Sequence, residues 1–172
     1  AWVSLDASDD DPATFWAYVA AALDAVLPDL AASAPEPLSA PPEAVITALI
    51  NGLAAHPDEV WLVLDDYHLV EGRGVHEGLT LLIDRLPPNA HVLLSTRSDP
   101  DLPLSRWRGR GELVELRAAD LRFTTDEAAA YLRSATGLDL GPADVALLGE
   151  RTEGWIAALQ LAALSLTGRD DA

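Results

Sequence analysis

Short apolar runs alternate with stretches of helical periodicity over the first two-thirds of the chain. Runs of strand length stand at 2–5, 60–64 and 91–96, and the alternating segment 112–116 also predicts a strand. Continuous apolar runs are typical of strands that are buried on both faces. Strands and helices in alternation therefore predict an α/β fold in which a parallel sheet carries helices on both faces.

Apolar residues recur at helical spacing between these runs. Asp11 and Pro12 are a typical helix start, with the aspartate as N-cap and the proline in the first turn. The other helices predicted in this part cover residues 43–55, 75–86 and 104–107. The proline-rich stretch 28–42 predicts an exposed linker between the first two helices.

The pattern changes to helices alone from Thr124 onward. Thr124 and Glu127 form a capping box, and Gly137 is a natural helix stop. Two more helices are predicted, from Gly141-Pro142 to about Arg151 and over Gly154–Leu166. We therefore expect two domains, an α/β core over residues 1–117 and a small all-helical part over residues 118–172.

The composition of the chain excludes several kinds of functional site. The net charge is −17, all 11 basic residues are arginine, and there is no cysteine. Such a chain should repel nucleic acid and anionic membranes, and it has no disulfide, thiolate metal site or cysteine nucleophile. Without lysine, a phosphate loop of the form G-x-x-x-x-G-K-[ST] cannot exist here. No apolar run approaches the roughly 20 residues that span a bilayer. The absence of cysteine fits a cytoplasmic location.

Two neighbouring strands are followed by charged residues. Asp65 and Asp66 end one strand, and Arg97 follows the next. In open parallel sheets, ligands gather beyond the carboxyl ends of the strands. A magnesium nucleotide would suit these residues, with Asp65 holding the metal, Asp66 orienting the attacking water and Arg97 meeting the terminal phosphate. In the structural alternative, the acids cap a turn and Arg97 pairs with one of them; the residues alone leave both open.

Other polar groups suggest weaker hypotheses. A metal-dependent hydrolase could use Asp65, Asp66 and His68, with His76 nearby, although the spacing matches no known zinc module. The glycines between 72 and 78 are spaced G-x-G-x-x-x-G, which is not a phosphate-loop spacing and predicts a flexible turn before a helix. Trp155, beside Gly154, could stack on a base, but a tryptophan that opens an amphipathic helix is more often part of a core.

Four stretches together resemble one protein family. They are VSLDASDDDPATFWAYV, WLVLDDYHLV with GVHEGL, the segment from HVLLSTRSDPDLP to TTDEAAAYL, and TEGWIAALQLAALSL. In this order they resemble the large ATP-binding LuxR-family (MalT-like) transcriptional regulators, over nearly the whole chain. The most specific parts are LVLDDYHL and TEGW-x-A-x-LQLAALSL.

The resemblance implies a STAND-class, P-loop NTPase-like ATPase module. Asp65 and Asp66 would be the Walker B acids, with Asp66 catalytic, and Arg97 would be the sensor arginine. Gly154 and Trp155 would lie near adenine, although Ile156 replaces the proline that related ATPases carry. The phosphate loop with its strand and helix would precede Trp2, so we expect a fragment of a longer protein that lacks the first strand. The absence of methionine and the strand at the very start agree with this.

The resemblance also implies an arrangement of the sheet. The absent strand would lie between the strands at 91–96 and 112–116. The strands that contain Val3, Leu62 and Leu93 should therefore pair side by side in parallel. The segment 113–116 should be displaced or should pair elsewhere, including with a second molecule.

The function implied is part of an ATP-binding signalling module that couples nucleotide state to transcription. ATP and Mg²⁺ would act in the longer parent protein, an ATPase, whereas this fragment alone should bind no cofactor and have no activity. Partners would be ATP or ADP, an effector, and DNA through a C-terminal helix-turn-helix outside this chain, with self-association as a further expectation. The alternatives are a self-sufficient protein–protein interaction module and the metal hydrolase.

Overall fold

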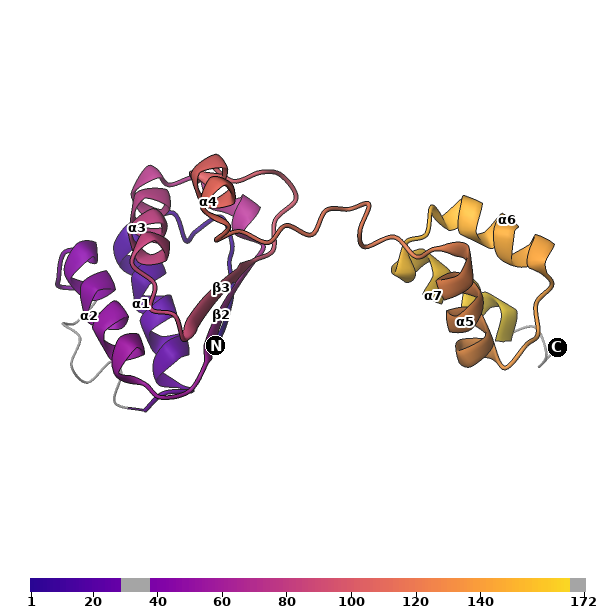
Figure 1. Ribbon diagram of the computed structural model, residues 1–172, viewed down its shortest axis with the longest axis horizontal. Helices are drawn as coiled ribbons and strands as arrows, with labels where there is room; N and C mark the ends of the chain where they lie inside the picture. Colours follow the sequence, from indigo (N-terminus) through magenta and orange to yellow (C-terminus); the bar gives the residue numbers. More distant parts are fainter. Residues whose placement is uncertain (29–37, 168–172) are drawn as a thin grey trace. The chain divides into compact units, whose positions relative to one another are not determined.

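The computed structural model describes residues 1–28 and 38–167. It contains two compact units, Ala1–Arg110 and Gly111–Ala172 (Figure 1). Most of the proline-rich stretch 28–42 lies outside the described residues, so the linker predicted there stays a prediction. The predicted boundary between residues 117 and 118 also stays a prediction.

The first unit has the α/β composition that the sequence pattern predicts. Its elements in chain order are β1 (Trp2–Ser4), α1 (Pro12–Asp24), α2 (Pro42–Ala55), β2 (Val60–Asp65), the 3-10 turn η2 (Tyr67–Leu69), α3 (Arg73–Asp84), β3 (Ala90–Leu94) and α4 (Leu104–Arg110). Asp11 caps α1 as predicted, because its carboxylate accepts a hydrogen bond from the Thr14 N–H. The predicted α/β class is confirmed.

The three strands form one parallel sheet in the order β1-β2-β3. The predicted side-by-side pairing is confirmed, since Val3 lies opposite Leu64 and Leu62 lies opposite Val92. The strand predicted over 112–116 is wrong. That segment has no strand structure, and Val114 is 88% exposed. Alternating residues become a strand only when a partner satisfies the backbone, and no described strand pairs with this segment.

One face of the sheet carries the core of the first unit. Val3, Leu62 and Leu64 point to this face and are buried. Helices α1, α2 and α3 lie together on that side (Figure 1). The most deeply buried helical side chains are Phe15, Trp16, Val19, Val45, Ile46, Leu49, Val75 and Leu79.

The opposite face of the sheet is open in the described unit, which corrects the prediction of helices on both faces. Trp2, Trp61 and Leu93 are 62%, 50% and 45% exposed. The strand order explains this. Both crossovers, β1 to β2 and β2 to β3, advance in the same direction across the sheet. Crossovers between parallel strands are right-handed, so both place their helices on the same side.

The second unit is a small helical bundle, as predicted. It contains α5 (Thr125–Thr136), α6 (Pro142–Thr152) and α7 (Ile156–Thr167). Both hydrogen bonds of the Thr124–Glu127 capping box are present, and Gly137 ends α5 with φ 71°. Its core consists of Ala128, Leu132, Val145, Leu159 and Ala163.

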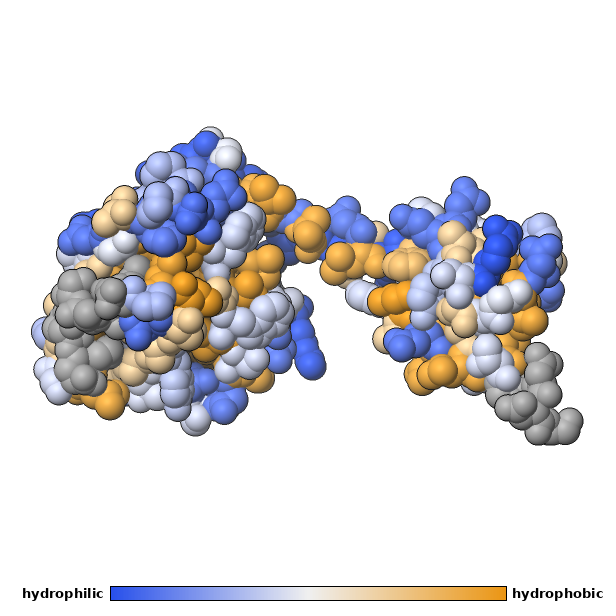
Figure 2. All heavy atoms as spheres, turned by 90° about the horizontal axis from the view of Figure 1, so that it is seen from below, coloured by the Kyte–Doolittle hydropathy of each residue, from blue (hydrophilic) through white to orange (hydrophobic). Residues whose placement is uncertain are grey.

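Apolar side chains also reach the surface of the second unit (Figure 2). On α7, Leu161 and Leu164 are 67% and 62% exposed, because this helix is apolar around most of its circumference. A helix of 12 residues is nevertheless too short to cross a bilayer. Within residues 1–28 and 38–167, no helix is both long and apolar enough to do so.

Candidate functional site

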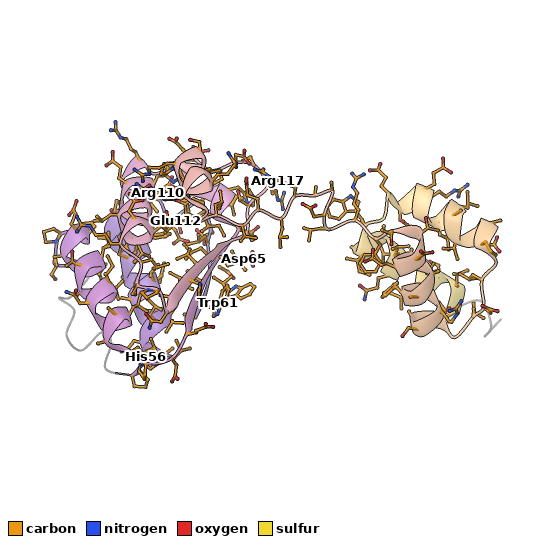
Figure 3. All side chains as sticks on the ribbon, viewed as in Figure 1. His56, Trp61, Asp65, Arg110, Glu112 and Arg117 are labelled. Atoms are coloured by element: carbon orange, nitrogen blue, oxygen red, sulfur yellow. The ribbon has the colours of Figure 1, made fainter. Side chains whose placement is uncertain are left out.

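The candidate site lies where β2 ends. Asp65 is the last residue of β2 and pairs with Ser4 of β1, and it lies two and four residues after Val63 and Trp61. Figure 3 labels Asp65 and Trp61. The Asp65 side chain therefore belongs to the open face of the sheet. The Ser95 hydroxyl donates a hydrogen bond of 2.5 Å to Asp65 Oδ1, and the Asp66 N–H donates another of 3.1 Å to the same oxygen.

Asp66 adopts an unusual backbone conformation. Its φ and ψ are 57° and 34°, in the left-handed region that non-glycine residues seldom occupy. The Tyr67 N–H then reaches the Ser95 carbonyl at 2.9 Å, so β3 holds the turn in place. The Asp66 side chain is 49% exposed. Strained residues of this kind cluster at functional sites, and here the strain presents a carboxylate to solvent beside Asp65.

Arg97 follows the next strand, as the sequence predicts. It is exposed, and no carboxylate of the described residues forms an ion pair with it. The structural alternative requires an ion pair between Arg97 and Asp65 or Asp66. The described residues contain no such pair. The predicted contact of Arg97 with a terminal phosphate stays a prediction.

Sequence reasoning missed Ser95, the residue that binds Asp65 most closely. Ser95 follows β3 directly and contacts the end of β2 through both its side chain and its backbone. The only signal was a small polar residue immediately after an apolar run, beside a strand that ends in acids. That signal is weak, because serine is also common in turns.

The histidines do not assemble a metal centre. His76 Nδ1 and the Tyr67 hydroxyl share a hydrogen bond of 2.7 Å, and burial raises the pKa of Tyr67. His68 Nδ1 lies 3.8 Å from Asp66 Oδ1. Within the described part of the chain, no three His, Cys, Asp or Glu side chains gather as metal ligands. The hydrolase alternative with Asp65, Asp66 and His68 thus lacks a ligand set.

The acidic loop after β1 supports the same edge of the sheet. Asp10 Oδ1 accepts hydrogen bonds from the Glu71 and Gly72 N–H groups at 2.6 and 2.9 Å. A Cβ on Gly72 would lie 2.4 Å from the Asp10 carbonyl oxygen. The glycine is needed for this close approach of two loops, which explains it without a phosphate.

Gly154 and Trp155 lie in the second unit, where local structure accounts for the glycine. Gly154 has φ 73°, and its carbonyl accepts a hydrogen bond of 2.8 Å from the Phe123 N–H. A Cβ there would lie 2.7 Å from the Phe123 carbonyl oxygen. Trp155 is 39% exposed and stacks under the Arg122 guanidinium at 5.7 Å. The adenine contact inferred for these two residues stays a prediction.

The first unit is thus an open parallel α/β unit whose middle strand ends in paired acids. The chain is similar to parts of two kinds of known protein. The chain is 38% identical over its whole length to the serine/threonine-protein kinase PknK of Mycobacterium tuberculosis. Over 95% of its length, it is 32% identical to the HTH-type transcriptional regulators MalT of Yersinia enterocolitica and Cronobacter sakazakii. No family model matches it.

These similarities confirm the resemblance to MalT-like regulators, and the chain is homologous to one segment of those proteins. The chain spans only 16% of the length of PknK and 19% of the length of MalT. The homology therefore concerns a part of each relative.

A pair of glycine substitutions tests whether Gly154 is structural. Gly137 and Gly154 both have positive φ, but only Gly154 has backbone atoms where a Cβ would lie. We expect Gly137→Ala to destabilise the second unit by about 1 kcal/mol. Gly154→Ala should cost about 2–4 kcal/mol, because overpacking adds to the backbone strain. Hydrogen exchange of α5 and α7 peptides measures both. Equal costs would contradict the structural role of the close approach to Phe123.

Proposed function

We propose that this chain is part of the ATP-binding signalling module of a bacterial LuxR-family transcriptional regulator, in which it couples nucleotide state to transcription. One observation carries the proposal. The middle strand of a parallel sheet ends in Asp65 and Asp66, with Asp66 in a left-handed conformation. The similarity to MalT supports it, since those relatives are HTH-type transcriptional regulators.

The donor groups at this edge fit magnesium. Asp65 offers a carboxylate whose Oδ1 is already hydrogen-bonded, and Asp66 offers a half-exposed one. Magnesium prefers oxygen ligands, keeps several waters, and is usually held by one or two carboxylates together with phosphate oxygens. In the proposed site Asp65 holds the metal, Asp66 accepts a proton from the attacking water, and Arg97 pairs with the terminal phosphate. When bound, the metal supplies positive charge that offsets both the acids and the phosphates.

The open face supports the idea that another segment completes the site. On the open face, Trp61, Val63 and Leu93 are apolar, and Ser4 and Asp65 at the carboxyl ends of the strands are polar; His91, which stacks on Trp61, is a polar residue at the other end. An amphipathic helix with its N-terminus at the polar end would bury the apolar part and aim its positive dipole end at phosphate.

The right-handedness of crossovers indicates which connection would place that helix on the open face. A further parallel strand could pair with the free edge of β3. Its connection to β1 would cross the sheet in the direction opposite to the two observed crossovers. A right-handed connection in that direction crosses the open face. The proposed preceding segment, a phosphate-binding strand and helix, satisfies this geometry. It also places the ligand beside a reversal of strand order, where nucleotides bind in such sheets.

In the longer regulator, nucleotide binding would favour one arrangement of the module, and an effector would shift that equilibrium toward self-association and DNA binding. The effector and the DNA would meet parts outside this chain. ATP and ADP would be the ligands of the module itself.

The second candidate is a protein–protein interaction module without nucleotide chemistry. Its support is the exposed apolar surface, including Trp2 and Trp61 on the open face. Nucleotide binding by the full-length gene product discriminates between the two, because the interaction module would bind no magnesium-ATP.

This chain by itself should not bind ATP tightly. Most phosphate affinity in such proteins comes from loop amides and a lysine, and this chain has no lysine and a net charge of −17. We expect a dissociation constant no lower than about 1 mM, or about −4 kcal/mol, and no ATPase activity. Calorimetric titration with magnesium-ATP checks this. A saturable micromolar isotherm that disappears in Arg97→Ala would mean that this chain holds a complete site.

In the full-length gene product, Asp66→Asn should retain ATP binding but slow hydrolysis by about 10²–10⁴-fold, because an amide cannot accept the proton of the attacking water. Single-turnover hydrolysis and nucleotide titration measure the two quantities. Asp58→Asn is the control, since Asp58 lies before β2, at the other end of that strand, with an 85% exposed side chain. Hydrolysis at the unmodified rate in Asp66→Asn would leave Asp66 with a role in the turn only.

A further inference from the structure

Ser95 is bonded to four consecutive residues at the end of β2. Its N–H donates to the Leu64 carbonyl at 3.0 Å, and its carbonyl accepts from the Tyr67 N–H at 2.9 Å. Its hydroxyl donates to Asp65 Oδ1 at 2.5 Å and accepts a hydrogen bond of 3.3 Å from the Asp66 N–H. One side chain therefore links the edge strand to both acids.

Because of these bonds, the two carboxylate oxygens of Asp65 differ in the hydrogen bonds that they accept. Oδ1 accepts hydrogen bonds from the Ser95 hydroxyl and the Asp66 N–H. Among the described residues, no donor is assigned to Oδ2. A carboxylate with one oxygen fixed by hydrogen bonds has little freedom to rotate, so its other oxygen points in a set direction. Hydrogen bonds of this kind orient metal ligands in proteins.

We propose that Ser95 is a positioning residue that aims the second oxygen of Asp65 at the metal of a magnesium nucleotide. This role rests on the function proposed above and adds a residue to it. The Ser95 hydroxyl need not touch the nucleotide. It acts through Asp65, and its backbone bonds make the position of that carboxylate depend on the position of β3.

A purely structural role for Ser95 makes a different prediction. If the hydroxyl only stabilised the turn, its loss would lower the melting temperature without changing the dependence of nucleotide binding on magnesium. If it positions Asp65, its loss would raise the magnesium concentration needed for binding. ATP binding without metal would stay the same, because Asp65 then has no cation to hold.

The test is ATP titration of the full-length gene product in EDTA and at a series of free Mg²⁺ concentrations. We expect Ser95→Ala to raise the half-saturating Mg²⁺ concentration about tenfold and to leave the affinity in EDTA unchanged. Ser95→Thr keeps the hydroxyl and should stay within about twofold of the unmodified protein. Ser98→Ala is the matched control, since Ser98 is an exposed serine of the same connection.

Ser95→Cys keeps the size of the side chain with a much weaker donor, so it tests the hydroxyl even where Ser95→Ala does not fold. A shift toward higher Mg²⁺ in each of the two variants that folds supports the proposal. An unchanged Mg²⁺ dependence in folded Ser95→Ala or Ser95→Cys overturns the role of Ser95 and leaves the proposed function standing. If the unmodified protein shows no magnesium-dependent ATP binding, both fail together.

Discussion

The right-handed crossover between parallel strands determines which face of the sheet the helices of the first unit cover. Because β1, β2 and β3 follow one another in a single direction, both crossovers place α1, α2 and α3 on one face. That face holds the core, and the other face exposes Trp61 and Leu93. Parallel sheets are normally covered on both sides, so the exposed apolar face is the surface that a further element of the proposed regulator would cover.

The turn that contains Asp65 and Asp66 is held in a conformation that costs free energy. Two adjacent carboxylates at a strand end repel each other, and Asp66 adds the cost of a left-handed backbone. The structure offsets part of this through the Ser95 hydroxyl and the backbone bonds between the end of β3 and the turn. A cation brought by a nucleotide would offset the remaining repulsion. An arrangement that is costly when empty and favourable when occupied suits a module that responds to nucleotide state.

Local signals in the sequence predicted most helices and strands. They could not predict strand order and strand partners, because these depend on pairing between distant segments. Asp11, Thr124 and Gly137 mark helix ends by chemistry that acts within one turn, and all three do so in the structure. The run around Trp61 looked buried on both faces because an apolar run carries no information about strand order. The segment 112–116 alternates like a strand but has no described partner. Asp65 and Asp66 could be located at the strand end, whereas Ser95 could not, since its importance arises from the register between β2 and β3.

In the proposed full-length gene product, a further strand pairs with the free edge of β3 and brings a phosphate-binding helix over the open face. Ser95 bonds toward β2, so the alternation along a strand turns the Val92 and Leu94 amides toward the free edge. Hydrogen exchange of the 90–96 peptide, compared between this chain and the full-length gene product, measures that pairing directly. We expect exchange at least about tenfold slower in the full-length protein, because new ladder bonds protect those amides. Equal exchange in the two proteins would contradict it.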